Sequence, residues 1–142
     1  MTDLEIAKTQ LRRKELTLAI VKNGKVLFET HSHRISGFLD AIEKLGNVLE
    51  GAAVADRVAG KAIALLCVYA KISNVYAEVL SKKAKAVFEK NGVRHEWKAL
   101  VKNVLDLNKS GVCPFEKAAA DISDPEKSYR TLQALQDSLK SC

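Results

Sequence analysis

The chain has 142 residues, of which 47% are hydrophobic and 28% are charged, a composition typical of one ordinary globular domain. Its 23 lysines and arginines outnumber its 17 aspartates and glutamates, which gives a formal net charge of +6. The basic residues are interleaved with acids along the whole chain, so the pattern favours a solvated surface over a nucleic-acid footprint. Nucleic acid is therefore not the expected partner, although the positive charge permits phosphate-bearing ligands.

The cysteines and the apolar segments indicate the cellular compartment in which the protein is expected. Cys67, Cys113 and Cys142 are odd in number and scattered, which indicates reduced thiols and no disulfide framework. The first residues lack the apolar core of a signal peptide, and the longest apolar run, residues 62–70, is too short to cross a bilayer. We expect a cytoplasmic protein that does not insert into membranes.

A short helix and a hairpin are predicted at the N-terminus. Residues 2–14 have the apolar spacing of a helix, and two short apolar strands, residues 16–21 and 26–28, follow it. Asn23-Gly24 between them is a strong hairpin signal, because both turn positions favour positive φ. Next, Ser36 is expected to cap a helix that Gly46 ends in a left-handed conformation.

Residues 54–70 are predicted to form one long, buried central helix. Asp56 would lie in its first turn, where a carboxylate is favourable to the helix dipole, and its second half is apolar nearly all round. Gly60 would then lie inside this helix, at a cost on the order of 1 kcal/mol relative to alanine. We expect close packing, or the approach of a ligand, to offset that cost.

A strand, a helix and a second strand are predicted after residue 73. Residues 74–80 read as a buried strand, Ser81 caps the helix that Asn91-Gly92 ends, and residues 93–100 form the second strand. This order implies a right-handed parallel crossover.

Two helices complete the chain. Pro114 opens a short helix that ends near Ala120, and Asp124-Pro125-Glu126 starts the last one. The expected fold is a single domain over residues 1–142, a three-layer α/β/α sandwich with an N-terminal hairpin and parallel strands. The last helix carries an apolar stripe formed by Tyr129, Leu132, Leu135 and Leu139.

Three segments resemble motifs of a family of uncharacterised bacterial proteins. They are Val54-Ala55-Asp56-Arg57-Val58-Ala59-Gly60-Lys61-Ala62, Tyr76-Ala77-Glu78-Val79 and Gly111-Val112-Cys113-Pro114-Phe115-Glu116-Lys117. The resemblance extends from the hairpin to residue 120. It implies a cytidine-deaminase-like fold, which agrees with the element order derived above.

The resemblance implies a fold without the zinc chemistry of the deaminases. Active members of that superfamily carry His- or Cys-x-Glu at the start of the central helix and Pro-Cys-x-x-Cys at the next strand–helix junction. The expected central helix begins Ala55-Asp56-Arg57-Val58, and the junction reads Leu80-Ser81-Lys82-Lys83-Ala84. Both ligand sets are missing, so we expect no metal, no cofactor and no zinc-dependent deamination.

A candidate site is predicted where the strands end and the helices begin, because ligands of open α/β sheets gather at that edge. The cysteine of the third motif is a candidate nucleophile, since a thiol at a helix N-terminus is activated by the dipole. The glutamate two residues after Pro114 is the second catalytic candidate, although as a capping-box acid it would oppose thiolate formation. A plain helix start with a small buried thiol is the alternative. The predicted ligand-binding residues are Asp56, Lys61, Glu78 and Ser81, and the catalytic candidates are Cys113 and Glu116.

The sequence leaves three functions open and does not determine the oligomeric state. The first is a non-zinc, deaminase-like scaffold that binds a small anionic or nucleotide-like ligand. The second is an enzyme with Cys113 as nucleophile and His31 or His33 as base. The two histidines would also supply half of a metal site, or merely polar residues at the end of a strand. The third, weaker hypothesis is a nucleic-acid or protein interaction domain.

Overall fold

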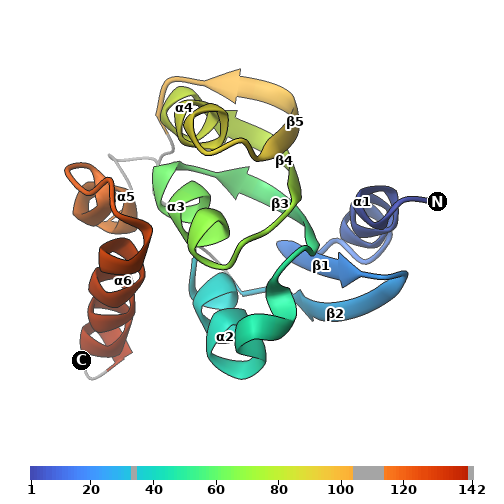
Figure 1. The fold of residues 1–142 in the computed structure, drawn as a ribbon, viewed down its shortest axis with the longest axis horizontal. Helices are drawn as coiled ribbons and strands as arrows, with labels where there is room; N and C mark the ends of the chain where they lie inside the picture. Colours follow the sequence, from blue (N-terminus) through green and yellow to red (C-terminus); the bar gives the residue numbers. More distant parts are fainter. Residues whose placement is uncertain (33–34, 104–113, 141–142) are drawn as a thin grey trace.

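The computed structural model describes residues 1–32, 35–103 and 114–140. The N-terminal elements are α1 (Asp3–Arg13), β1 (Leu18–Lys22), β2 (Lys25–Thr30), α2 (Ser36–Leu45) and the 3-10 turn η1 (Gly46–Leu49). The C-terminal elements are β3 (Ala53–Ala59), α3 (Lys61–Tyr69), β4 (Asn74–Ser81), α4 (Lys82–Lys90), β5 (Arg94–Val101), α5 (Pro114–Ala119) and α6 (Pro125–Lys140). Figure 1 shows their arrangement.

The strands form one mixed sheet in the order β2-β1-β3-β4-β5. β1 runs antiparallel to β2 and β3, whereas β3, β4 and β5 run parallel. The predicted hairpin is confirmed, because Asn23 and Gly24 adopt φ angles of 53° and 76° between β1 and β2. The predicted parallel crossover is also confirmed, with α4 connecting β4 to β5.

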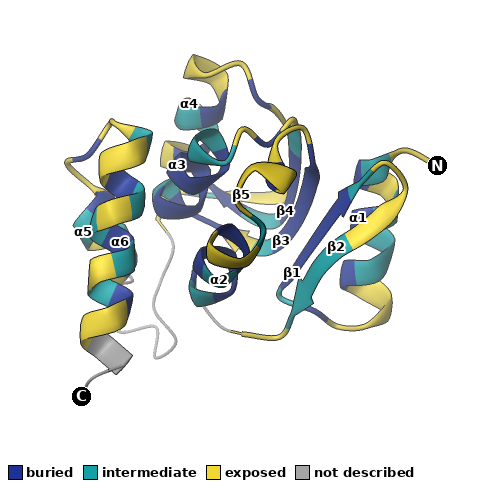
Figure 2. Cartoon of the chain, turned by 60° about the horizontal axis from the view of Figure 1, so that its bottom comes forward, coloured by how far each residue is buried: buried dark blue, intermediate teal, exposed yellow. Residues whose placement is uncertain are grey.

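Helices cover both faces of the sheet, as predicted. On one face, α1 buries Leu4, Ala7 and Leu11 against small and apolar residues of β1 and β3. On the other face lies the larger core, which α2, α3 and α4 share, and α5 and α6 pack against the outside of α3. Figure 2 shows the consequence, since β1 and most of β3 in the middle of the sheet are buried whereas β2 is partly buried or exposed. The α/β/α fold class is confirmed.

The prediction of one central helix over residues 54–70 is wrong. Residues 53–59 are the strand β3, and the central helix α3 begins only at Lys61. Both segments are rich in buried apolar residues, so hydrophobic content alone did not separate the strand from the helix. Asp56 therefore lies in a strand instead of a helix start, and Gly60 is the residue before α3 instead of an interior helical glycine.

Most other boundaries agree with the expectations. Gly46 ends α2 with a φ of 49°, and the Asp124 carboxylate accepts a hydrogen bond from Lys127 N at 3.1 Å at the start of α6. Ser36 is the exception, because it is the first residue of α2, and the N-cap position is held by Ile35 without a side-chain hydrogen bond. No helix within the described part of the chain is long and apolar enough to span a membrane.

Candidate functional site

Two helices begin at the same edge of the sheet. Ala59 and Leu80 pair near the ends of the parallel strands β3 and β4, and α3 and α4 start directly after them. The backbone amides of both first turns and the positive ends of two helix dipoles thus point to one side of the molecule.

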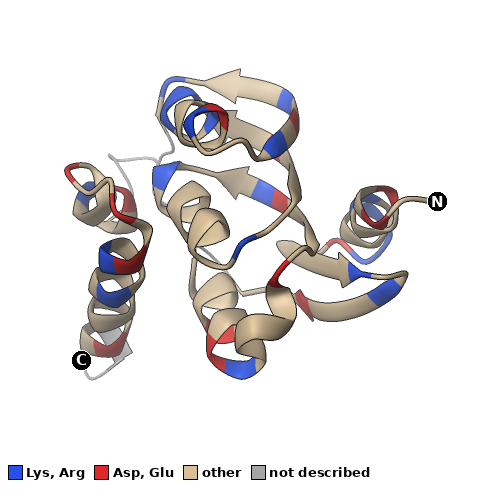
Figure 3. Cartoon of the chain, viewed as in Figure 1, with Lys and Arg blue, Asp and Glu red and all other residues tan. Residues whose placement is uncertain are grey.

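The first turns of these helices carry lysines and no acids. Lys61 opens α3, and the exposed Lys82 and Lys83 open α4. Basic side chains at a helix N-terminus are electrostatically unfavourable, because they add to the positive end of the dipole. Figure 3 shows basic residues gathered over α4. The helix dipoles and the lysines therefore make this edge electropositive.

One carboxylate enters this edge from a distant part of the chain. Glu116 of α5 accepts hydrogen bonds from two amides of α3, from Lys61 N at 3.0 Å through Oε2 and from Ala62 N at 2.7 Å through Oε1. Lys61 Nζ in turn donates to the carbonyl of Ala120 at 2.7 Å. The adjacent Phe115 is buried in the core and fixes α5 in place. Glu116 therefore occupies the position at the start of α3 that an external anion would take.

Gly60 makes room for this carboxylate. A Cβ atom built on Gly60 would overlap both oxygens of Glu116 and its carboxyl carbon. The φ of Gly60 is −101°, which any residue adopts, so the glycine is explained by the close approach of Glu116 and not by backbone strain. The sequence analysis placed Gly60 inside a helix and expected close packing or a ligand to offset its cost. That placement is wrong, because Gly60 precedes α3 and the group that approaches it is the side chain of Glu116.

Ser81 caps the second helix. Its buried hydroxyl accepts a hydrogen bond from Ala84 N at 3.0 Å. Among the sequence-predicted site residues, the structure therefore brings Lys61, Ser81 and Glu116 to the same edge. Glu116 was expected to cap its own helix, and its role at α3 was missed.

Asp56 lies deeper than predicted. It pairs with Leu18 and Ala77 three residues before the end of β3, and only 7% of its surface is exposed. Val58 N donates to its Oδ1 at 3.2 Å, but burial raises the pKa of the carboxyl to about 7. Burial also raises the pKa of the Cys67 thiol on α3, and the charge of Asp56 adds to this effect. Asp56 therefore belongs to the layer between the sheet and α3, away from the helix starts.

Glu78 lies on the opposite face of the sheet. Its Oε2 accepts a hydrogen bond from the hydroxyl of Tyr76 at 3.0 Å, and Arg12 of α1 donates to the same hydroxyl at 3.2 Å. The sheet thus separates Glu78 from Glu116, and the predicted pocket that contained both residues does not form as expected.

The structure says less about the remaining candidate residues, which are the cysteine of the third motif and the two histidines. Cys113 and His33 lie outside the described residues, so the nucleophile and the paired histidines stay predictions. His31 is exposed, with Nε2 at 3.2 Å from the carbonyl oxygen of Lys14. Within residues 1–32, 35–103 and 114–140, no group of three or more His, Cys, Asp or Glu residues is placed to hold a metal ion.

A family model and one solved structure match nearly the whole chain. The model of the TM1506 domain of unknown function, DUF1893, matches residues 6–135. The crystal structure of the DUF1893 family protein TM1506 from Thermotoga maritima is similar with a TM-score of 0.86 and 27% identity, covering 94% of this chain and 90% of that one. A search of curated proteins finds no match.

Two further solved structures are more distantly similar. The dCMP deaminase of cyanophage S-TIM5 has a TM-score of 0.53 and 16% identity, covering 66% of this chain and 97% of that one. RibD of Acinetobacter baumannii has a TM-score of 0.51 and 14% identity, covering 68% of this chain and 35% of that one. At these identities the likeness shows the fold alone. The cytidine-deaminase-like fold implied by the sequence motifs is confirmed.

The residues at the two helix starts do not fit the zinc ion of a deaminase. With α3 beginning at Lys61, the first junction reads Gly60-Lys61-Ala62-Ile63, and the second reads Ser81-Lys82-Lys83-Ala84. Neither supplies an imidazole or thiolate ligand, and lysine ammonium groups repel a cation. The shifted start of the central helix therefore leaves the sequence-based conclusion on these junctions unchanged.

Proposed function

The chain belongs to the DUF1893 family of unknown function, and we propose that it is a non-zinc, deaminase-like module that binds a small anionic, nucleotide-like ligand. The observation that carries this proposal is the carboxylate of Glu116 on two amides of α3, at an edge whose helix starts bear Lys61, Lys82 and Lys83. Because the protein holds its own carboxylate at this position, the site supports a preference of this edge for anions.

In this proposal the start of α4 is the open half of the site. Lys82 and Lys83 are exposed, whereas the lysine and the amides that open α3 already have partners. A phosphate group would bind the two α4 lysines and the positive end of the helix dipole. An acidic ligand that reaches further would compete with Glu116 for the two α3 amides.

The nucleotide-like character of the ligand rests on the fold. Ligands of open α/β sheets bind outside the carboxyl ends of parallel strands, which is the edge where β3 and β4 lead into α3 and α4. The similar structure from the cyanophage is a dCMP deaminase, so a nucleoside monophosphate is the first ligand to test. The cytoplasmic location predicted from the unpaired cysteines is part of the same proposal.

A thermal-shift titration tests the proposal. We expect dCMP and CMP to raise the melting temperature in a concentration-dependent way, and uncharged cytidine to have little effect. A ligand at tenfold its dissociation constant stabilises the native state by about 1.4 kcal/mol. The double variant Lys82→Ala/Lys83→Ala should abolish the shift, whereas Glu116→Gln should increase it because the competing charge is gone.

The matched control is Lys25→Ala/Lys90→Ala, which removes the same charge from the start of β2 and from the opposite end of α4. This variant should retain the full shift. An equal loss in both double variants would mean that net charge alone attracts the nucleotide. No shift with any nucleotide or with inorganic phosphate would overturn the proposal.

A further inference from the structure

β5 forms one edge of the sheet. In the strand order β2-β1-β3-β4-β5 it pairs with β4 on one side, and no strand of the described residues covers its other side. The strand runs from Arg94 to Val101 without a proline or glycine. Such an uncovered edge presents unpaired backbone N–H and C=O groups, which are a template for pairing with another strand.

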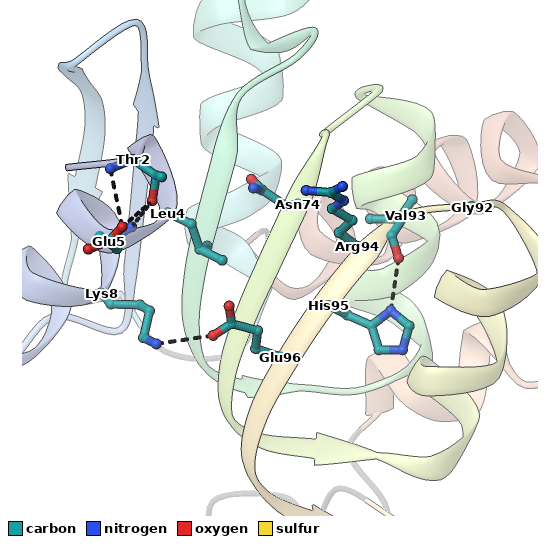
Figure 4. A pocket seen from close by; sticks show the side chains of 10 residues that line it. All are labelled: Thr2, Leu4, Glu5, Lys8, Asn74, Gly92, Val93, Arg94, His95 and Glu96. Carbon is teal, nitrogen blue, oxygen red and sulfur yellow. Dashed lines mark hydrogen bonds and ion pairs between the residues drawn. The ribbon is translucent and has the colours of Figure 1, made fainter.

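The two faces of β5 are chemically distinct. Glu96 points towards α1 and accepts a hydrogen bond from Lys8 Nζ at 3.1 Å, as Figure 4 shows. His95 and Trp97 lie on the α4 face, where the His95 ring stacks on Phe88 at 5.6 Å and on Trp97 at 5.9 Å. Because side chains alternate along a strand, Lys98 shares the α1 face with Glu96.

Two large hydrophobic side chains of β5 are exposed. Trp97 and Leu100 each show 37% of their surface. Trp97 is partly covered by Lys85 of α4, whose Nζ lies 5.6 Å from the indole ring. A tryptophan in this position at the centre of an uncovered edge is typical of an interface.

The charge pattern of β5 is complementary to itself in one antiparallel register. Two symmetric registers allow the longest overlap. In the first, Trp97 lies opposite Trp97 of the second copy, and Glu96 lies opposite Lys98 on both sides of the twofold axis. In the second, Lys98 would lie opposite Lys98, which is repulsive. The first register also places the apolar Leu100 opposite the aliphatic stem of Arg94.

We infer that β5 is a homodimer interface, in which it pairs antiparallel with β5 of a second copy about a twofold axis at Trp97. The sheet would then continue across both copies, with two Glu96–Lys98 pairs on the α1 face and a Trp97–Trp97 contact on the α4 face. Such an interface uses one patch of both copies and closes on itself, so it removes the exposed edge without forming a fibre. This inference is independent of the proposed ligand.

Sedimentation velocity over a dilution series of the full chain tests the inference. We expect a concentration-dependent dimer for the unmodified protein. Lys98→Glu places two carboxylates opposite each other on both sides of the twofold axis, and it should raise the dimer dissociation constant by roughly 10- to 100-fold. Glu96→Lys should weaken the dimer to a similar extent, because it places lysines opposite each other.

Charge exchange provides the decisive measurement. The double variant Glu96→Lys/Lys98→Glu restores both attractive pairs and should dimerise as the unmodified protein does. An equimolar mixture of the Lys98→Glu and Glu96→Lys proteins should form a heterodimer, since every cross-strand pair is then attractive. Neither result is expected if the substitutions act only by destabilising the monomer.

The matched control is Lys8→Ala, which removes the partner of Glu96 within the chain and leaves the edge unchanged. It should dimerise normally, with melting curves of all variants confirming that they fold. A monomer at every concentration of the unmodified protein would overturn the inference. So would a dimer that neither single charge reversal weakens, because its interface would lie elsewhere.

Discussion

α3 and α4 both follow parallel strands and begin at the same edge of the sheet, yet they are capped differently. α4 is capped by Ser81, three residues before the amide that it accepts from. α3 is capped by Glu116, which lies more than 50 residues further along the chain. The Ser81 cap contacts only its own helix, whereas the Glu116 cap connects α5 to the start of α3 at the edge of the sheet. A local cap and a distant cap therefore satisfy the same backbone groups but couple them to different parts of the fold.

Asp56 is the counterpart of Glu116, because it is a carboxylate in the same part of the fold that no helix-terminal amide stabilises. It lies in β3, on the same strand–helix unit as the α3 start, but it is buried away from any helix N-terminus. Burial raises its pKa from 3.8 to about 7, so between these values the folded protein holds a proton that the unfolded chain releases. The free energy of unfolding should therefore fall as the pH rises from about 4 to about 7, by at most about 4 kcal/mol.

Urea unfolding at pH 5 and pH 8 measures this effect. Asp56→Asn removes the titrating group, so it should flatten the dependence and stabilise the protein at pH 8 by on the order of 2 kcal/mol. Asp121→Asn, at an exposed position, is the matched control and should leave the dependence intact. If Asp56→Asn lost stability at pH 8, the backbone hydrogen bonds to the carboxylate would outweigh the cost of its burial.

The distant cap should stabilise the fold more than the local one. Glu116→Ala removes a charged acceptor from two backbone amides, and we expect a loss of about 2 kcal/mol in the free energy of unfolding. Glu116→Gln keeps one acceptor oxygen and should lose about half as much. Denaturant melts at pH 7 provide both values, and a loss in Glu116→Ala well below that of the local cap would contradict the ranking.

Gly60→Ala tests whether the loss of stability in Glu116→Ala comes from the contact between Glu116 and the start of α3. The new Cβ would occupy the place of the carboxylate and displace the side chain of Glu116. The single variant should therefore lose about as much as Glu116→Ala, and the double variant should lose little more than either one. Additive losses would mean that Gly60 serves a purpose unrelated to Glu116.

The contrast between the caps also explains what the sequence was able to predict. Ser81 was identified because a serine cap and its helix are neighbours in the chain. The role of Glu116 was missed because its partners belong to α3, which is far away in the sequence. No residue near Glu116 indicates that its carboxylate contacts that helix. The one signal in the sequence was Gly60, because a glycine at this position indicates that another group approaches closely. It does not indicate which group that is.

The errors at β3 and β4 have different physical origins. β3 was taken for helix because β3 and α3 are both rich in buried apolar residues and only Gly60 separates them. Glu78 was expected in the same site as Lys61 and Ser81, although the alternation of strand side chains places it on the same face as Tyr76, so this error was avoidable. The hairpin, the crossover and the helix starts at Ser81 and Asp124 carried local signals, and they were predicted correctly.

The smallest expected effect belongs to the local cap of α4. Ser81→Ala should lower the free energy of unfolding by about 1 kcal/mol, because it leaves the amide of Ala84 without its acceptor. Ser81→Thr retains the hydroxyl and should recover part of the loss, since the remaining cost is the extra methyl group in a buried position. Unlike Glu116→Ala, this substitution should leave hydrogen exchange in α5 and α6 unchanged, because the cap bond of Ser81 lies within α4. Faster exchange in those helices after Ser81→Ala would show that the two helix starts respond as one unit and would remove the distinction between the caps.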